Sequence, residues 1–273
     1  MRHFERRFIR MIELNKIYNE NCLETMSRMP DNFIDLTVTS PPYDNLRTYN
    51  GYDFDFESIA KELFRVTKQG GVVVWVVGDA TINGSETGTS FRQALYFKEI
   101  GFNLHDTMIF RKTSGGAVGS NYCYWQSFEF MFVFSKGRPK TITLIKDKKN
   151  VTAGREDTVI KKNIEVGSRL HRKGIVTQEF GIRENIWDYN IGFISGGDST
   201  EHPAPFPEKL ARDHIYSWSN EGDLVYDPFV GSGTTAKMAH LQKRNWIGSE
   251  ISKEYCELAE KRIEPYLKQT SLF

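Results

Sequence analysis

The chain has 273 residues, of which 39% are hydrophobic, so it is long enough to bury one substantial core. Its three cysteines are widely separated and form no Cys-x-x-Cys pair, which excludes a disulfide scaffold and a zinc site and indicates a reducing cytoplasm. The formal net charge is +1, and without an apolar run of membrane-spanning length or a secretory signal we expect no membrane association.

The first part of the chain alternates predicted strands and helices. We expect strands over residues 16–21, 34–40 and 72–78, and helices over 23–29, 58–68 and 91–100. Gln69-Gly70-Gly71 is interpreted as the stop signal of the second helix. The valine-rich run at 72–78 is continuously apolar, as in a parallel strand buried on both faces. Such alternation predicts a mostly parallel α/β sheet.

The segment Thr39-Ser40-Pro41-Pro42-Tyr43 ends the second predicted strand. Two successive prolines remove two backbone donors and fix φ, so the carbonyls before them stay outside regular hydrogen bonding. The strand end therefore presents a hydroxyl, free carbonyls and an aromatic ring at one point. These groups suit the exocyclic amino group of a flat base. The polar and aromatic loop Tyr43–Phe56 is expected to cover this site.

Two further strands are predicted over 104–111 and 128–134. Within them, residues 107–111 and 129–134 form a hairpin-like pair that indicates an antiparallel edge. Between them, residues 114–125 combine glycines with clustered aromatic side chains. Two interpretations stay open for this segment. It is either a mobile loop that stacks on a base or lines an extrusion pocket, or a loop whose aromatic rings pack down on the sheet.

Basic residues concentrate in the region that follows. Residues 137–175 hold eleven Lys and Arg against four Asp and Glu, a local charge of +7. A basic segment on a mildly acidic body is a plausible footprint for phosphate contacts, although a solvated loop has the same composition. Residues 137–190 show no clear periodicity, and we interpret them as a small recognition region.

A nucleotide-type loop lies near the C-terminus. Residues 224–235 read as a short apolar strand, Asp227, Pro, Phe229 and the turn Gly231-Ser-Gly233-Thr234, followed by helical residues 236–243. Glycines let the backbone approach a ligand, and a helix N-terminus offers N–H groups to a carboxylate or phosphate. A second strand at 245–250 ends in Glu250, whose spacing suits an acceptor for ribose hydroxyls.

These motifs resemble those of the DNA amino-methyltransferases, and the similarity covers about residues 15–136 and 183–265. Ser40-Pro41-Pro42-Tyr43 is similar to the family's catalytic motif. The run from Asp227 to Thr234 looks like its S-adenosylmethionine (AdoMet) loop. Residues 202–210 resemble a segment that closes over AdoMet, with Phe206 at its centre. The catalytic motif comes first, as in the circularly permuted β class.

The resemblance also implies a cofactor contact at the end of the first strand. The family's Gly-Asp-Cys-Leu, whose acid contacts the adenine amine of AdoMet, is replaced here by Glu-Asn21-Cys22-Leu. The Asn21 amide oxygen can still accept from that amine, but without a charge. The implied cofactor site thus comprises Asn21, Cys22, Phe206, Asp227, Phe229, Gly231, Gly233, Thr234 and Glu250, with no metal.

The implied fold is α/β and Rossmann-like, a mostly parallel twisted sheet with an antiparallel edge, permuted motif order and a small target-recognition insertion. We expect a catalytic half at 1–136, the basic target-recognition region at 137–190 and the AdoMet-binding half at 191–273. The implied reaction is methyl transfer from AdoMet to an exocyclic amine of a base flipped out of duplex DNA. No covalent adduct with the base is needed, and none of the three cysteines follows a proline as in cytosine-C5 enzymes, so Ser40 is expected to accept from and orient the amine.

The first residue of the catalytic motif bears on the target. Ser-Pro-Pro-Tyr resembles cytosine-N4 enzymes and Asp-Pro-Pro-Tyr adenine-N6 enzymes, so Ser40 favours N4-cytosine and leaves N6-adenine as the alternative. RNA or protein-glutamine methyltransferases, a nicotinamide oxidoreductase and a non-catalytic DNA-binding protein are weaker alternatives. A cognate restriction endonuclease and a homodimer are plausible partners of a cytoplasmic enzyme of this kind.

Overall fold

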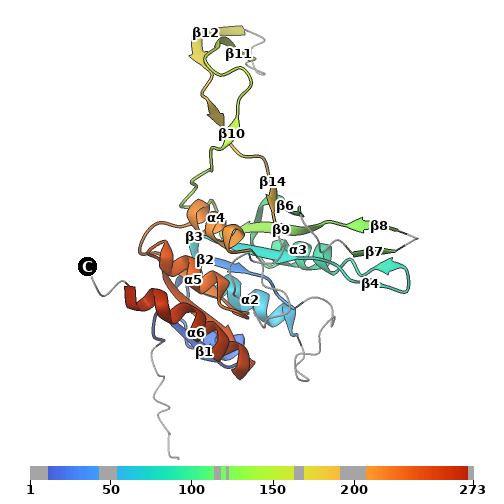
Figure 1. Cartoon of the computed structure of the whole chain (residues 1–273), viewed down its shortest axis with the longest axis vertical. Helices are drawn as coiled ribbons and strands as arrows, with labels where there is room; N and C mark the ends of the chain where they lie inside the picture. The colour runs from blue at the N-terminus through green and yellow to red at the C-terminus, as the bar shows by residue number, and fades with distance from the viewer. Residues whose placement is uncertain are drawn as a thin grey trace, which may run out of the picture. The chain divides into compact units, whose positions relative to one another are not determined.

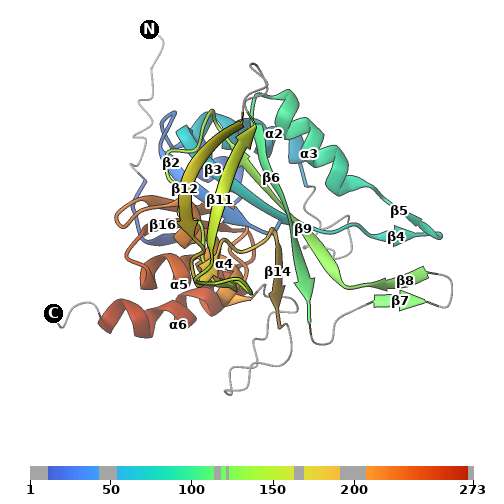
Figure 2. The same ribbon diagram turned by 90° about the horizontal axis from the view of Figure 1, so that it is seen from above.

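An eight-stranded sheet runs through the larger part of the protein in a computed structural model (Figures 1 and 2). The structure describes residues 12–42, 54–113, 118–120, 123–162, 169–190 and 207–269. In spatial order the strands are β1 (Lys16–Asn19), β16 (Asn245–Glu250), β15 (Leu224–Asp227), β2 (Ile34–Thr39), β3 (Thr67–Val77), β9 (Phe128–Ser135), β6 (Asn103–Lys112) and β14 (Ile186–Tyr189).

Seven of these strands are parallel, and β9 runs antiparallel to both of its neighbours, β3 and β6. The predicted antiparallel pairing of 107–111 with 129–134 is therefore confirmed, but β9 lies inside the sheet and not at its edge. The edge is β14, which pairs in parallel with β6. This strand lies in the region where the sequence shows no clear periodicity. It has only four residues, of which Trp187 and Tyr189 are buried, and so short a strand is not recognisable from alternating hydrophobicity.

Helices cover both faces of the sheet, which explains why its central strands are buried along most of their length. The helices α1 (Cys22–Ser27), α2 (Phe56–Val66) and α3 (Thr89–Glu99) pack on one face. On the other lie α4 (Glu208–Trp218), α5 (Thr234–Leu241) and α6 (Lys253–Gln269). The described residues contain no helix that is both long and apolar enough to cross a membrane.

The predicted stop signal at Gln69-Gly70-Gly71 was wrong. Helix α2 ends at Val66, and β3 begins at once with Thr67, so the glycines lie inside the strand. Thr67 pairs with Ile34 and Val72 with Leu36, which leaves extra residues on β3 as a bulge. Gly70 adopts a φ of +81° there, a conformation that favours glycine.

Aromatic packing under α3 fixes the end of β3. Trp75 is fully buried and its indole N–H donates to Oε1 of Gln93 on α3 at 2.8 Å. The ring of Phe97 lies 5.2 Å from Trp75 and 4.6 Å from Phe134, measured between centroids. These contacts tie β3 and β9 to one helix.

Two small ribbons belong to the same part of the chain as the sheet: β4 (Thr81–Ile82) with β5 (Ser85–Glu86), and β7 (Val118–Ser120) with β8 (Cys123–Gln126). The second ribbon replaces most of the loop predicted over 114–125. On β8, Tyr124 is 99% and Trp125 70% exposed, so these rings do not pack down on the sheet.

Residues 144–184 form a separate compact unit. It consists of two antiparallel ribbons, β10 (Lys148–Lys149) with β13 (Phe180–Gly181) and β11 (Glu156–Lys162) with β12 (Arg169–Val176). Within it, Nδ2 of Asn150 donates to the Gln178 carbonyl at 2.8 Å, and Arg183 forms an ion pair with Asp147. The unit lies inside the predicted recognition region.

Candidate active site

The two halves of the predicted site meet at the ends of two neighbouring strands. Strands β2 and β15 pair in parallel, so Thr39 and Asp227 end them at the same edge of the sheet. Thr39 Oγ1 donates to Asp227 Oδ1 at 2.7 Å, and both side chains are buried. Thr235 Oγ1, at the start of α5, donates to the Val38 carbonyl at 3.1 Å. These two hydrogen bonds join residues that are 188 and 197 positions apart in the chain.

Ser40 and Pro41 leave the sheet directly at this junction. Pairing of β2 with β3 stops at Thr39 opposite Trp75, and the prolines that follow carry no N–H to continue it. Ser40 is half-buried, Pro41 is buried and Pro42 half-buried. Tyr43 lies outside the described residues, as does most of the loop predicted to cover the site.

The glycine turn after Asp227 is shaped by two residues with positive φ. Gly231 has a φ of +52° and Gly233 a φ of +82°, and Gly233 is the N-cap of α5. A Cβ on Gly233 would lie 3.0 Å from the Cβ of Ala259 on α6. Glycine therefore allows α5 and α6 to approach, and Thr234 begins α5 as a buried residue.

Glu250 holds this turn from the end of β16. Its Oε2 accepts from the Gly231 N–H and its Oε1 from the Ser252 N–H, both at 2.9 Å. Burial raises the pKa of Glu250, although these backbone hydrogen bonds oppose the rise. Each oxygen of a carboxylate has a second lone pair, so the group can hold the loop and still accept from a ligand hydroxyl.

Asp227 is a carboxyl group in a fully buried position. Desolvation raises its pKa from 3.8 to about 6, against hydrogen bonds from Thr39, the Phe229 N–H and Thr235 that favour the charged form. The nearby carboxyl of Glu250 adds to the rise. A cation bound beside these two acids would favour their charged forms, since opposite charges lower a carboxyl pKa.

The turn after β1 lies beside Glu250 and carries Asn21 and Cys22. Asn21 is the N-cap of α1, and its side-chain oxygen accepts from the Leu23 N–H at 2.9 Å. One acceptor position of this amide is thus used within the helix. Cys22 is 5% exposed, and burial raises the pKa of its thiol to about 12, so it stays neutral.

Phe229 supplies an aromatic wall next to Asp227. Its ring is half-buried and lies 5.7 Å from Phe54 and 6.2 Å from Trp75, in edge-to-face arrangements. These contacts leave part of the ring accessible at the edge where β2 and β15 end. Phe206 lies outside the described residues.

Sequence reasoning missed the group that supports the glycine turn from outside. Arg262 on α6 donates to the Ser232 carbonyl at 3.1 Å and hydroxyl at 3.0 Å, and to Thr234 Oγ1 at 3.1 Å. It also forms an ion pair with Glu208, which Lys237 joins at 2.7 Å. Arg262 lies in a charged amphipathic helix with no motif around it, so no local pattern distinguishes it.

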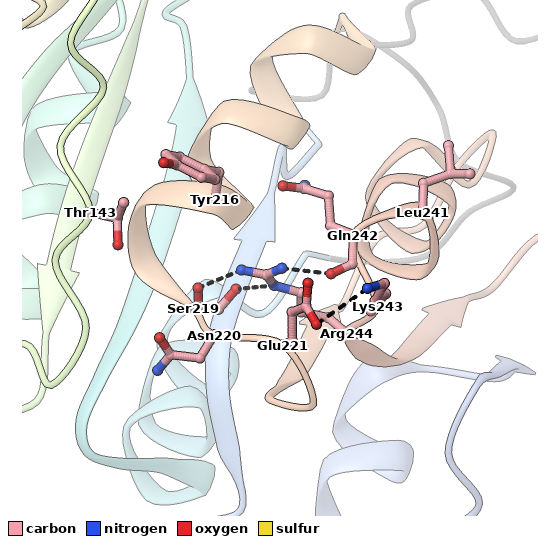
Figure 3. Close-up of a pocket in the computed structure, with 9 residues that line it drawn as sticks. All are labelled: Thr143, Tyr216, Ser219, Asn220, Glu221, Leu241, Gln242, Lys243 and Arg244. Carbon is pink, nitrogen blue, oxygen red and sulfur yellow. Dashed lines mark hydrogen bonds and ion pairs between the residues drawn. The ribbon is translucent and has the colours of Figure 1, made fainter.

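A pocket of about 430 Å³ lies at the opposite, amino edge of the sheet (Figure 3). There Arg244 donates to the carbonyls of Ser219 and Gln242, both at 2.6 Å, and Lys243 pairs with Glu221. The guanidinium joins the loops that precede β15 and β16, which is a structural role. None of the predicted site residues lines this pocket.

A glycine turn, an acid at the next strand end and a hydroxyl-proline corner, all at the carboxyl edge of a parallel sheet, define a nucleotide-type site in an α/β enzyme. Among the described residues, no group of three or more His, Cys, Asp or Glu is placed to hold a metal. Comparison with known proteins agrees with this class.

The model of the DNA methylase family N6_N4_Mtase matches residues 34–261. The orphan methyltransferase M.BamHII of Bacillus amyloliquefaciens is 59% identical over 244 residues, covering 86% of this chain and 90% of that protein. The chain belongs to the N6/N4 DNA methylase family. It is a DNA methyltransferase, as the motifs at residues 39–43 and 227–235 predicted.

Solved structures confirm the Rossmann-like fold. The PvuII DNA methyltransferase (cytosine-N4-specific) matches with a TM-score of 0.67 and 22% identity, over 95% of this chain and 93% of that one. The M1.HpyAVI–SAM complex matches with a TM-score of 0.61 and 22% identity, over 90% and 98% of the two chains.

Proposed function

We propose that the protein transfers a methyl group from AdoMet to the N4 amine of cytosine at specific sites in duplex DNA. The observation that carries the proposal is the hydrogen bond between Thr39 and Asp227. This bond supports the proposal because it joins the strand that leads into the Ser-Pro-Pro corner to the strand that leads into the glycine turn, and direct transfer needs the two bound molecules close together.

The residues at the carboxyl edge fit AdoMet. Bound there, AdoMet supplies an activated methyl group on a positively charged sulfonium. Asp227 and Glu250 are the acids nearest the turn, and Glu250 can accept from ribose hydroxyls while it holds Gly231. Phe229 offers an exposed part of its ring to the adenine, and Asn21 retains one acceptor position.

Ser40 and the Pro41 carbonyl receive the amine in this proposal. The amine nitrogen is a weak nucleophile, because its lone pair is delocalised into the ring. Hydrogen bonds from its N–H groups to Ser40 Oγ and the Pro41 carbonyl would stabilise charge that develops during transfer. A base in a duplex has to leave the stack to reach them. Tyr43 is assigned to stack on the extruded ring.

Cytosine is favoured over adenine by Ser40, the first residue of the motif. Adenine-N6 methylation is the second candidate, because both bases present an amine conjugated to a ring nitrogen. The basic unit of residues 144–184 is assigned to target recognition. We also propose that the protein forms a homodimer, that it has a cognate restriction endonuclease as a partner, and that it is located in the cytoplasm.

Labelled AdoMet and duplex DNA test the reaction directly. After incubation and digestion, we expect label in N4-methylcytosine, with positions then mapped by sequencing DNA from cells that express the protein. Label in N6-methyladenine would establish the second candidate. Label in 5-methylcytosine would contradict the amine mechanism, since carbon methylation requires a covalent adduct with the base.

A further inference from the structure

The β7–β8 ribbon carries the most exposed aromatic rings of the described residues. Tyr124 is 99% and Trp125 70% exposed, although large aromatic side chains are usually well buried. Successive residues on a strand point to opposite faces, so the two rings lie on the two sides of the ribbon. Phe128, at the foot of the ribbon, is 45% exposed.

The ribbon rises from the same edge of the sheet as Ser40. Thr39 pairs with Trp75 and Trp75 with Phe132, so these residues lie at one level across three strands. Phe128 lies four residues further along β9, about 13 Å beyond that level at 3.3 Å per residue. Strand β9 lies two positions from β2, about 10 Å to the side. Figure 2 shows the ribbon projecting from the sheet next to β9, and the strand pairing places its foot at the edge where β2 ends.

The foot of the ribbon is firmly held. Phe128 pairs with Arg111, and the Lys112 N–H donates to the Ser127 carbonyl at 2.7 Å. Gln126 Nε2 donates to Glu86 Oε1 at 2.7 Å, which joins the ribbon to β4–β5. A two-stranded ribbon alone is only marginally stable, and these contacts support its exposed rings.

The chemistry of the ribbon fits bases and not phosphates. Residues 113–128 contain no charged side chain, whereas the basic residues of the chain concentrate further on. A two-stranded ribbon fits the major groove of duplex DNA, and inserted apolar side chains unstack base steps. An uncharged ribbon with protruding rings has the properties of a wedge.

We propose that the β7–β8 ribbon enters the duplex beside the target base, and that Trp125 and Tyr124 stack on the bases left by its extrusion. The inference rests on the proposed function and extends it to the step that opens the duplex. The rings would replace stacking lost when the base leaves, which lowers the cost of extrusion.

The test is single-turnover methyl transfer by Trp125→Ala and Tyr124→Ala on two duplexes, one with the target base paired and one with it opposite an abasic site. On the paired duplex we expect a rate about 5- to 140-fold lower, the equivalent of 1–3 kcal/mol of stacking at 1.4 kcal/mol per factor of ten. On the abasic duplex most of the rate should return, because extrusion there costs little.

Controls separate this role from folding and from charge. AdoMet affinity, thermal midpoint and the salt dependence of DNA binding should be unchanged, and Trp125→Phe should retain most of the rate. Tyr216→Ala, an exposed aromatic on α4 at the other edge, should behave like wild type. Equal losses on both duplexes, no loss on either, or a changed oligomeric state that accounts for the loss would overturn the inference. A wild-type protein that methylates no duplex would overturn the proposed function itself.

Discussion

At Asp227 the site places a carboxyl group where burial opposes its charge. The residue is 2% exposed, and its pKa is raised to about 6 although three hydrogen bonds favour ionisation. An acid whose pKa is higher in the folded state destabilises that state as pH rises from the unfolded value to the folded one. Between about pH 4 and 6 the protein therefore loses stability to this group, and a bound cation would offset the loss.

The variant Asp227→Asn tests whether the charge on this buried carboxyl group destabilises the folded state. Asparagine keeps an acceptor for Thr39 and Phe229 but carries no charge, so the free energy of unfolding at pH 7.5 should rise by up to about 3 kcal/mol, two pKa units at 1.36 kcal/mol each. AdoMet affinity should fall. In the wild type, AdoMet affinity should weaken as the pH falls through 6, whereas in the variant it should not change with pH. Urea unfolding measures the stability, and calorimetry measures the affinity.

The exposed acid Asp188 on β14, which forms an ion pair with Arg111 on β6, provides the control. Its pKa is lowered by that guanidinium, so Asp188→Asn should leave the pH dependence of AdoMet affinity unchanged. An Asp227→Asn variant with wild-type affinity at every pH would contradict the assignment of this acid to the AdoMet site.

At the level of elements, the glycine turn and α5 are held between β2, β16 and α6. Thr235 bonds β2, Glu250 bonds the Gly231 N–H, and Arg262 on α6 bonds Ser232 and Thr234. The turn is therefore fixed from three sides before any ligand binds. Such preorganisation reduces the entropy lost on binding.

Gly233→Ala should disturb this arrangement in two ways. Alanine at a φ of +82° is strained by about 1–2 kcal/mol, and its Cβ would meet Ala259 at 3.0 Å, so a larger loss of stability is expected. Gly222→Ala is matched, since Gly222 has a φ of +85° and nothing within 4 Å of its Cβ position. Chemical denaturation should give a larger loss for Gly233→Ala, together with weaker AdoMet binding; equal losses would refute the packing role.

In the molecule as a whole, the excess of basic residues and the proposed methyl-transfer residues lie in different parts of the chain. The unit of residues 144–184 holds ten Lys and Arg against six Asp and Glu, whereas the proposed methyl-transfer residues all lie in the other unit. Binding to phosphates releases counterions, so these charges should set the salt dependence of DNA affinity.

Lys146→Ala with Lys149→Ala tests this division, since both side chains are exposed. If each contacts one phosphate, the slope of log affinity against log salt should fall by about 1.8. AdoMet affinity should stay at the wild-type value. The same pair of changes at Lys253 and Lys261 on α6 is the control, and an equal effect there would contradict the assignment.

The sequence predicted the elements of the sheet well wherever a run was long or strongly apolar. Strands β2, β3, β6, β9, β15 and β16 and helices α1, α2, α3 and α5 were all anticipated, with ends shifted by a few residues. The errors have local causes. Gly70 and Gly71 were assigned to a helix end, because glycine is as suitable for a bulge in a strand as for a helix stop.

Sequence alone determined the class of chemistry, because the proline corner and the glycine turn depend on residue types that few other structures need. Only the tertiary structure decided what surrounds them: the Thr39–Asp227 bond, the support from Arg262, the edge strand β14 and the exposed ribbon at Trp125. Each of these joins segments far apart in the chain or depends on exposure. Local pattern contains neither kind of information, since both arise when the strands pack side by side.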